Sequence, residues 1–218
     1  MLGLAIIGGE GPEPEVCRLA ARGAGIVAAA DSGLVAAEEA GISADWIIGD
    51  MDSLDTGKRL EKYPADRICR FPEDKDFTDT ELALDLLWEK GCSEIWLLGG
   101  GGGRLDHLLA IYSIFERNKF PKRWITATDD IYCLDVSDSA ADSAKLEKCL
   151  PINSMVSVLP VGAGPWAAES CGLKWPLDGL IWNRGSTGIS NRTIRNSFSI
   201  KAIRGRYIVI LPLKTGEE

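Results

Sequence analysis

Acidic side chains follow several short apolar stretches of the chain, at the points where strands are expected to end. They form three groups, namely Asp31, then Asp50 and Asp52, then Asp74, Asp76 and Asp79. In an open parallel sheet, the carboxyl ends of the strands meet at one edge, where ligands bind. Carboxylates this close repel one another unless a cation holds them. Oxygen-only ligands suit Mg²⁺, which usually also binds substrate phosphates. The pattern predicts a magnesium site, with Asp50, Asp52 and Asp76 as the favoured ligands.

Each acidic group also has a purely structural interpretation. Asp50 and Asp52 would point the same way in an extended backbone, and so could share one cation. In a turn, each would instead cap a backbone N–H group. Thr78 is predicted to be a helix N-cap, with Glu81 at the capping-box position. Asp79 suits the first turn of that helix whatever the function, although a helix N-terminus is also an anion site that a phosphate can share.

Five consecutive glycines, Gly99 to Gly103, precede Arg104 after an apolar run. Such a run carries a large entropic cost, and a close approach between backbone and ligand explains it best. It is not a Walker A loop, and it does not match the dinucleotide-binding fingerprint. Arg104 is suited to clamp phosphate. Beside it, His107 could be a general base, but next to Asp106 at a helix start a structural role is favoured. Together these residues predict a magnesium-dependent enzyme acting on a nucleoside triphosphate.

Composition narrows the class of protein. A net charge of −8 argues against broad nucleic-acid binding, which requires a basic face. No apolar run is long enough to span a membrane, and the first nine residues lack the basic start of a signal peptide. The six cysteines are scattered without a C-x-x-C pair, which favours reduced thiols and a cytoplasmic location.

Alternating patterns predict an α/β fold with a parallel sheet over the first part of the chain. Strands are expected at 4–8, 25–30, 45–48, 67–71, 93–98 and 123–128. Helices are expected at 13–22, 34–40, 57–63, 79–90 and 105–117. After a polar connection, short β-like runs at 155–160, 166–169, 179–183, 197–202 and 207–211 predict an all-β sandwich or barrel. The expected division is an α/β nucleotide-binding domain at 1–136, a connecting segment at 137–149 and a β domain at 150–218.

Several of these segments, in this order and spacing, resemble the thiamine pyrophosphokinase family. The matching segments are 30–33 (Ala-Asp-Ser-Gly), 48–53 (Ile-Gly-Asp-Met-Asp-Ser), 74–79 (Asp-Lys-Asp-Phe-Thr-Asp), 102–107 (Gly-Gly-Arg-Leu-Asp-His), 172–175 (Gly-Leu-Lys-Trp) and 190–191 (Ser-Asn). The likeness covers nearly the whole chain. It departs at Ser32 and Leu34, where smaller residues are expected, and at Arg192, where an acidic residue is common.

The resemblance implies transfer of pyrophosphate from ATP to the hydroxyl of thiamine, giving thiamine diphosphate and AMP. It implies a homodimer, with the thiamine site between the first domain of one subunit and the second domain of the other. The implied magnesium pocket comprises Asp31, Asp50, Asp52 and Asp76. The implied ATP site comprises Thr78, Asp79, Gly101, Gly102, Gly103, Arg104, Asp106 and His107. The implied thiamine site comprises Trp175, Ser190 and Asn191.

Two alternatives remain open from the sequence. The same ATP chemistry could serve another small alcohol, such as a pterin. A nucleotide-binding module without turnover would carry the same acidic and glycine-rich segments. The base that accepts the hydroxyl proton is also open, with Asp31 and Asp76 as candidates.

Overall fold

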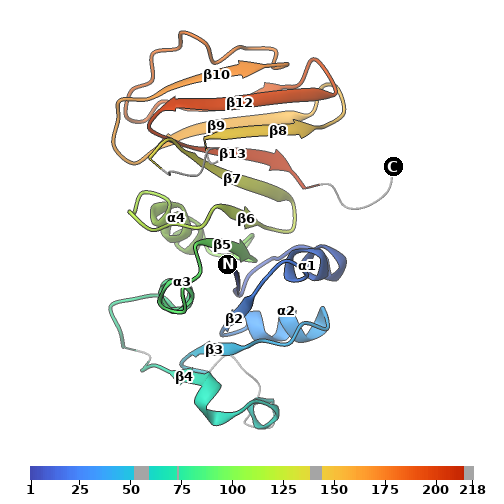
Figure 1. Cartoon of the computed structure of the whole chain (residues 1–218), viewed down its shortest axis with the longest axis vertical. Coiled ribbons are helices and arrows are strands. Elements are labelled where there is room, and N and C mark those ends of the chain that lie inside the picture. The colour runs from blue at the N-terminus through green and yellow to red at the C-terminus, as the bar shows by residue number, and fades with distance from the viewer. Residues whose placement is uncertain (52–58, 73, 138–143, 214–218) are drawn as a thin grey trace. The chain divides into compact units, whose positions relative to one another are not determined.

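The computed structural model describes residues 1–51, 59–72, 74–137 and 144–213 (Figure 1). They form two compact units. The first contains residues 1–114 and 124–128, and the second contains residues 115–123 and those from 129 onward. Among the described residues, none of the helices has the length and apolar character needed to span a membrane.

The strands of the first unit form a sheet in the order β6-β5-β1-β2-β3-β4. They are β1 (Leu2–Ile6), β2 (Ile26–Ala30), β3 (Trp46–Gly49), β4 (Ile68–Arg70), β5 (Glu94–Leu98) and β6 (Arg123–Ile125), of which Trp124 and Ile125 belong to this unit. From β5 to β4 all neighbouring pairs are parallel. Ala28, Ala29 and Ala30 of β2 are buried, as in a parallel sheet that is covered on both faces. The predicted mixed α/β fold is confirmed.

Four helices accompany this sheet: α1 (Pro14–Ala21), α2 (Gly33–Glu39), α3 (Asp79–Glu89) and α4 (Leu105–Ile114). Figure 1 shows α1 and α2 on one side of the sheet and α3 and α4 on the other. The predicted capping box of α3 is present, because the Thr78 hydroxyl accepts the Glu81 N–H while the Glu81 carboxylate accepts the Thr78 N–H at 2.8 Å. This cap fixes where α3 begins.

The second unit consists of antiparallel strands in two sheets, ordered β11-β9-β13-β7 and β10-β12-β8. They are β7 (Asp129–Asp135), β8 (Lys145–Cys149), β9 (Met155–Val161), β10 (Ala167–Cys171), β11 (Gly188–Arg192), β12 (Ser197–Arg204) and β13 (Arg206–Pro212). Both sheets contribute to one hydrophobic core, with Val156 and Tyr207 from the first and Phe198 and Ile200 from the second. Alternate residues of β12 face this core, which is the period expected of a half-buried strand.

Several predicted elements differ from the structure. The strand predicted at 179–183 is wrong, because these residues form a turn and irregular backbone. Of the helix predicted at 57–63, residues 57 and 58 lie outside the described residues, and the rest contains only the 3₁₀ turn η1 (Leu60–Lys62). A second 3₁₀ turn, η2 (Ala65–Arg67), leads into β4. Helix α4 ends at Ile114, three residues before the expected end at residue 117.

The two units also divide the chain differently from the expected limits. Strand β7 lies within the range assigned to the α/β domain, and β8 lies within the expected connecting segment, yet both belong to the second unit. Charged residues stand at both ends of β7, and Leu146 is the one buried residue of β8, so both sequences look polar.

Candidate active site

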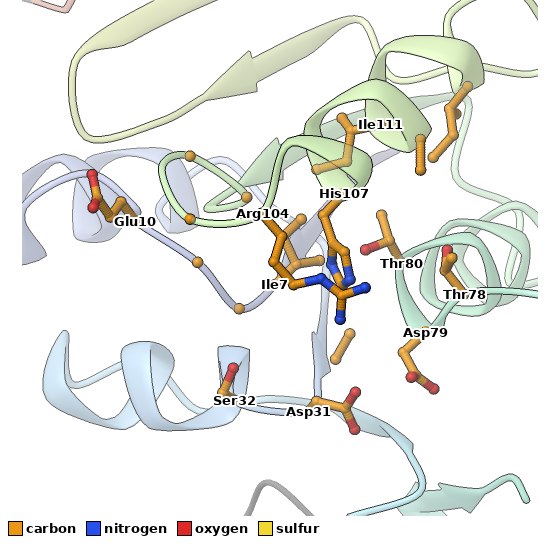
Figure 2. A pocket seen from close by; sticks show the side chains of 18 of the residues that line it. Ile7, Glu10, Asp31, Ser32, Thr78, Asp79, Thr80, Arg104, His107 and Ile111 are labelled. Carbon is orange, nitrogen blue, oxygen red and sulfur yellow. The ribbon is translucent and has the colours of Figure 1, made fainter. Parts of the chain in front are cut away.

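A cavity of about 680 Å³ opens in the first unit, where β1, β2, β3 and β5 end. Its walls come from the loops after these strands and from the first turns of α3 and α4. Figure 2 shows Arg104 and His107 reaching in from the start of α4, with Asp31 and Asp79 on the facing side. The carboxyl ends of the strands therefore form a pocket, as predicted for an open parallel sheet.

Asp31 lies at the centre of the acidic side of the cavity. Its φ is 45°, which is unusual for a residue other than glycine, and its backbone N–H donates to the Ile48 carbonyl at 2.9 Å. The buried Oδ1 atom has no hydrogen-bond partner in the described structure and lies over Gly49, where an added Cβ would approach it to 1.8 Å. A strained backbone and an orphaned buried oxygen are features that cluster at functional sites.

The pKa of Asp31 is raised from its usual 3.8 to about 7, first by burial and then by the neighbouring carboxylates Asp79 and Asp50. Lys75 opposes this shift. The Lys75 Nζ lies 2.8 Å from the Asp79 Oδ1, an ion pair that lacks hydrogen-bond alignment. Asp31, Asp50 and Asp79 thus act on one another electrostatically, with one lysine among them.

The other two predicted metal ligands are Asp76 and Asp52. Asp76 is exposed and does not belong to the described lining of the cavity. Asp52 lies outside the described residues. Met51 has a φ of 69°, so the backbone between Asp50 and Asp52 is not extended as the paired-carboxylate argument assumed. Among the described residues, no three acidic, histidine or cysteine side chains converge closely enough to hold a metal ion by themselves.

Arg104 reaches the cavity from a highly exposed position and is held by Asp106. Its Nε donates to the Asp106 Oδ1 at 3.1 Å, and one terminal nitrogen lies 2.5 Å from Oδ2. This bidentate pair raises the pKa of Arg104 and lowers that of Asp106. Asp106 also accepts the His107 N–H at 3.0 Å. Asp106 therefore orients Arg104 from outside the described lining of the cavity. Arg104 and His107 both line the cavity.

Backbone conformation and close packing explain most of the glycine run, which the sequence analysis attributed to a bound ligand. Four of its members, all except Gly101, have positive φ. A Cβ on Gly100 would lie 2.5 Å from Ile111 Cδ1, and one on Gly101 would lie 2.6 Å from the Glu10 carbonyl. Packing and backbone conformation therefore account for much of the run, contrary to our interpretation. Gly103 alone combines a positive φ with open space and a place in the cavity lining.

Thr78 lines the cavity, but its hydroxyl is committed to the α3 cap, where it also donates to Glu81 at 2.8 Å. Two residues that the sequence analysis did not select also line the cavity. Lys75 was visible as the only base in the acidic segment 74–79, and Glu10 as the acidic residue in the glycine-rich loop after β1.

The predicted thiamine residues lie together in the second unit. Asn191 is 5% exposed, and its side-chain amide accepts the Trp175 N–H at 3.1 Å and donates to the Trp175 carbonyl at 2.6 Å. The Trp175 ring is 53% exposed, and Lys174 Nζ lies 4.6 Å from its centre. Ser190 has a φ of 61°, and its N–H donates to the Ser157 hydroxyl. Asn191 therefore positions the backbone of Trp175 and leaves its ring open to solvent.

The family model for the catalytic domain of thiamin pyrophosphokinase matches residues 17–126. The chain belongs to the thiamin pyrophosphokinase family. The matched range includes Asp31, Asp50, Asp79 and Arg104, so the family assignment and the cavity rest on the same part of the chain. Members of this family are enzymes, and the chain is accordingly an enzyme.

Individual relatives agree with this assignment. Thiamine pyrophosphokinase of Bacillus subtilis (strain 168) is 27% identical over 168 residues, which cover 74% of this chain and 75% of that protein. The crystal structure of thiamine pyrophosphokinase from Bacillus subtilis superposes with a TM-score of 0.76 at 23% identity, covering 98% of this chain and 100% of that one. Thiamin pyrophosphokinase from Candida albicans gives a TM-score of 0.71 at 15% identity, covering 98% and 89%. The two structural matches show that the fold is shared.

Proposed function

We propose that the cavity of the first unit binds ATP and passes its pyrophosphoryl group to the hydroxyl of thiamine, releasing AMP. A bond then forms between the hydroxyl oxygen and the β-phosphorus of ATP, while the bond from that phosphorus to the AMP oxygen breaks. The observation that carries the proposal is the convergence of Asp31, Asp50, Asp79, Lys75 and Arg104 on one cavity, within the range that the family model matches. Such transfers depend on positioning and charge neutralisation more than on covalent catalysis.

The acidic side of the cavity fits a magnesium ion. All donors there are carboxylate oxygens, and the buried Asp31 Oδ1 lacks a hydrogen-bond partner beside the charges of Asp79 and Asp50. We propose that Asp50 and Asp79 hold the ion together with Asp52, which the sequence motif adds. Asp79 replaces Asp76 in this proposal because it lines the cavity and Asp76 does not. Phosphate oxygens and water would complete the shell, as is usual for Mg²⁺, which would neutralise phosphate charge.

The cations and the helix N-terminus provide the phosphate contacts. Lys75 and Arg104 line the same cavity, and the first turn of α3 presents its positive dipole end there. Arg104 is pre-oriented by Asp106, so a phosphate would meet a guanidinium whose position is already fixed. We propose that these groups, together with the backbone near Gly103, bind the triphosphate.

Asp31 is the better candidate for the proton acceptor. Of the two candidates that the sequence left open, Asp31 lines the cavity, whereas Asp76 is exposed outside it. A pKa of about 7 also suits a group that must take up a proton near neutral pH. We propose that Asp31 accepts the proton of the attacking hydroxyl.

We propose that Trp175, in the second unit, forms part of the site for the acceptor thiamine. Its exposed ring suits the thiazolium cation of thiamine, and Lys174 already occupies a cation–π position over it. The family resemblance implies that this surface serves the cavity of a second subunit in a homodimer. We retain the homodimer as part of the proposal, and the cytoplasmic location as a prediction from the scattered cysteines, which include no C-x-x-C pair.

The test is to measure AMP and thiamine diphosphate formed from ATP, thiamine and Mg²⁺. Asp50→Asn is the test variant, and Asp66→Asn, an exposed residue of η2 outside the cavity lining, is the matched control. We expect equal amounts of the two products from the wild type and from the control, and a loss of both in Asp50→Asn.

Other outcomes point to the alternatives. AMP without thiamine diphosphate would indicate another acceptor, such as a pterin alcohol. ATP binding without AMP would indicate a nucleotide-binding module and refute the proposed function.

A further inference from the structure

Glu10 occupies a fixed place on the wall of the cavity. Its N–H donates to the Gly101 carbonyl at 2.7 Å, and its carbonyl accepts the Gly101 N–H at 3.0 Å. These two bonds join the loop after β1 to the glycine run after β5. The Glu10 carboxylate lies against Gly102, where an added Cβ would approach Glu10 Cδ to 2.3 Å. The two hydrogen bonds thus fix the Glu10 backbone, and its exposed carboxylate lies beside the glycine run.

The charges of the cavity are unevenly placed. Asp31, Asp79 and Arg104 gather on one side in Figure 2, whereas Glu10 lies at the far left, away from them. Lys75 also belongs to the acidic side, because it pairs with Asp79. Among the described lining residues, Glu10 is the one carboxylate outside the acidic group. Phosphate oxygens belong near the cations and the metal, and a carboxylate repels them. Phosphate is therefore a poor neighbour for Glu10, whereas a hydrogen-bond donor of the nucleotide would suit it.

We propose that Glu10 accepts hydrogen bonds from the ribose hydroxyls of the bound nucleotide and thereby selects ribonucleotides over deoxyribonucleotides. This inference rests on the proposed function, since it requires a nucleoside triphosphate in the cavity. An ionised carboxylate only accepts hydrogen bonds, and its two oxygens match two adjacent hydroxyl donors. In dinucleotide-binding α/β proteins a carboxylate likewise accepts a hydrogen bond from a ribose hydroxyl, from a position about 20 residues beyond the first strand's loop.

The test is calorimetric binding of ATP, 2′-deoxy-ATP and 3′-deoxy-ATP, with Mg²⁺ and without thiamine. Glu10→Gln and Glu10→Ala are the variants, and Glu13→Gln, an exposed glutamate outside the described cavity lining, is the matched control. We expect the wild type and the control to bind ATP about 10- to 100-fold more tightly than either deoxynucleotide, the range for a hydrogen bond to a charged group. Both Glu10 variants should bind all three nucleotides with similar affinity.

Two further ligands identify which contact is lost. Magnesium tripolyphosphate should bind equally well to the wild type and to Glu10→Ala, because Glu10 does not contact the phosphates; this also verifies that the variant is folded. Inosine triphosphate, which lacks the adenine amine, should lose affinity in Glu10→Ala as strongly as ATP does. A variant that preserves the discrimination against deoxynucleotides would overturn the inference. Loss of discrimination between ATP and inosine triphosphate instead would assign Glu10 to the base and also overturn it.

These binding measurements separate the inference from the proposed function. If the wild type makes no AMP but discriminates between ATP and deoxynucleotides through Glu10, the inference is supported and the proposed enzyme activity is refuted. Normal turnover with unchanged discrimination in Glu10→Ala would refute the inference alone.

Discussion

Replacing Asp31 with Asn should stabilise the magnesium-free protein at alkaline pH. The folded-state pKa of Asp31 is raised from 3.8 to about 7, so the folded protein prefers the neutral carboxyl. The stability contributed by that proton is complete below about pH 4 and is lost as the pH rises to about 7. Asn stays neutral throughout, and the variant therefore does not suffer this loss.

The size of the effect follows from the two pKa values. A rise from 3.8 to about 7 corresponds to at most about 4 kcal/mol of unfolding free energy. The Asp31 side chain is only partly buried, and its charge is shared with Asp79 and Asp50. Solvent screening and this coupling reduce the expected gain to about 1–2 kcal/mol.

The assay is urea unfolding at pH 5 and pH 8 in the presence of a chelator, for the wild type, Asp31→Asn and the control Asp66→Asn. The difference in unfolding free energy between Asp31→Asn and the wild type should be about 1 kcal/mol larger at pH 8 than at pH 5, because about two thirds of the window between the two pKa values lies above pH 5. Added Mg²⁺ should shrink it at pH 8, because the ion favours ionised carboxylates. The same difference at both pH values would refute the argument that Asp31 is held neutral by its neighbours.

Three further predictions concern the helix cap, the second core and the assembly. Thr78→Ala removes the capping box of α3 and should cost about 1 kcal/mol of unfolding free energy, measured by urea titration against Thr78→Ser, which should retain most of it. Tyr207→Phe should raise stability by about 1 kcal/mol, because the fully buried Tyr207 hydroxyl has no hydrogen-bond partner among the described residues; destabilisation would reveal a partner elsewhere. Mixing inactive Asp50→Asn with inactive Trp175→Ala should restore about a quarter of wild-type activity if each site uses two subunits of a homodimer that exchange freely. No recovery after confirmed subunit exchange would place both residues in one subunit's site.

The sequence predicted elements well where local signals agree with the fold. Thr78 and Glu81 correctly predicted the start of α3, and short apolar runs correctly predicted β1, β2, β3 and β5. It failed where long-range pairing decides the structure. Strand β7 carries charged residues that find partners only in the folded unit, as Asp135 does with Arg206, which lies 2.9 Å away. Residues 179–183 have β-like composition, but they do not pair as a strand.

The sequence predicted part of the candidate site and missed the rest. Strand ends identified Asp31 and Asp50, because topology brings these ends together. Spacing alone could not decide between Asp76 and Asp79. The answer depends on which of the two side chains the start of α3 turns toward the cavity, and that side chain is Asp79. The glycine run looked like a ligand loop because the sequence does not show that Glu10 and Ile111 press against it.

The backbone pairing of Glu10 with Gly101 has a consequence for synthesis of the chain. Glu10 leaves the ribosome about 90 residues before Gly101, a delay of roughly 5–20 seconds at ordinary rates of synthesis. During that interval the loop after β1 has no partner, and no complete nucleotide pocket exists. On the proposed function, ATP would therefore stabilise the nascent first unit only after β5 and its glycines have emerged. Nucleotide present in the cell would protect the finished unit without trapping the half-made one.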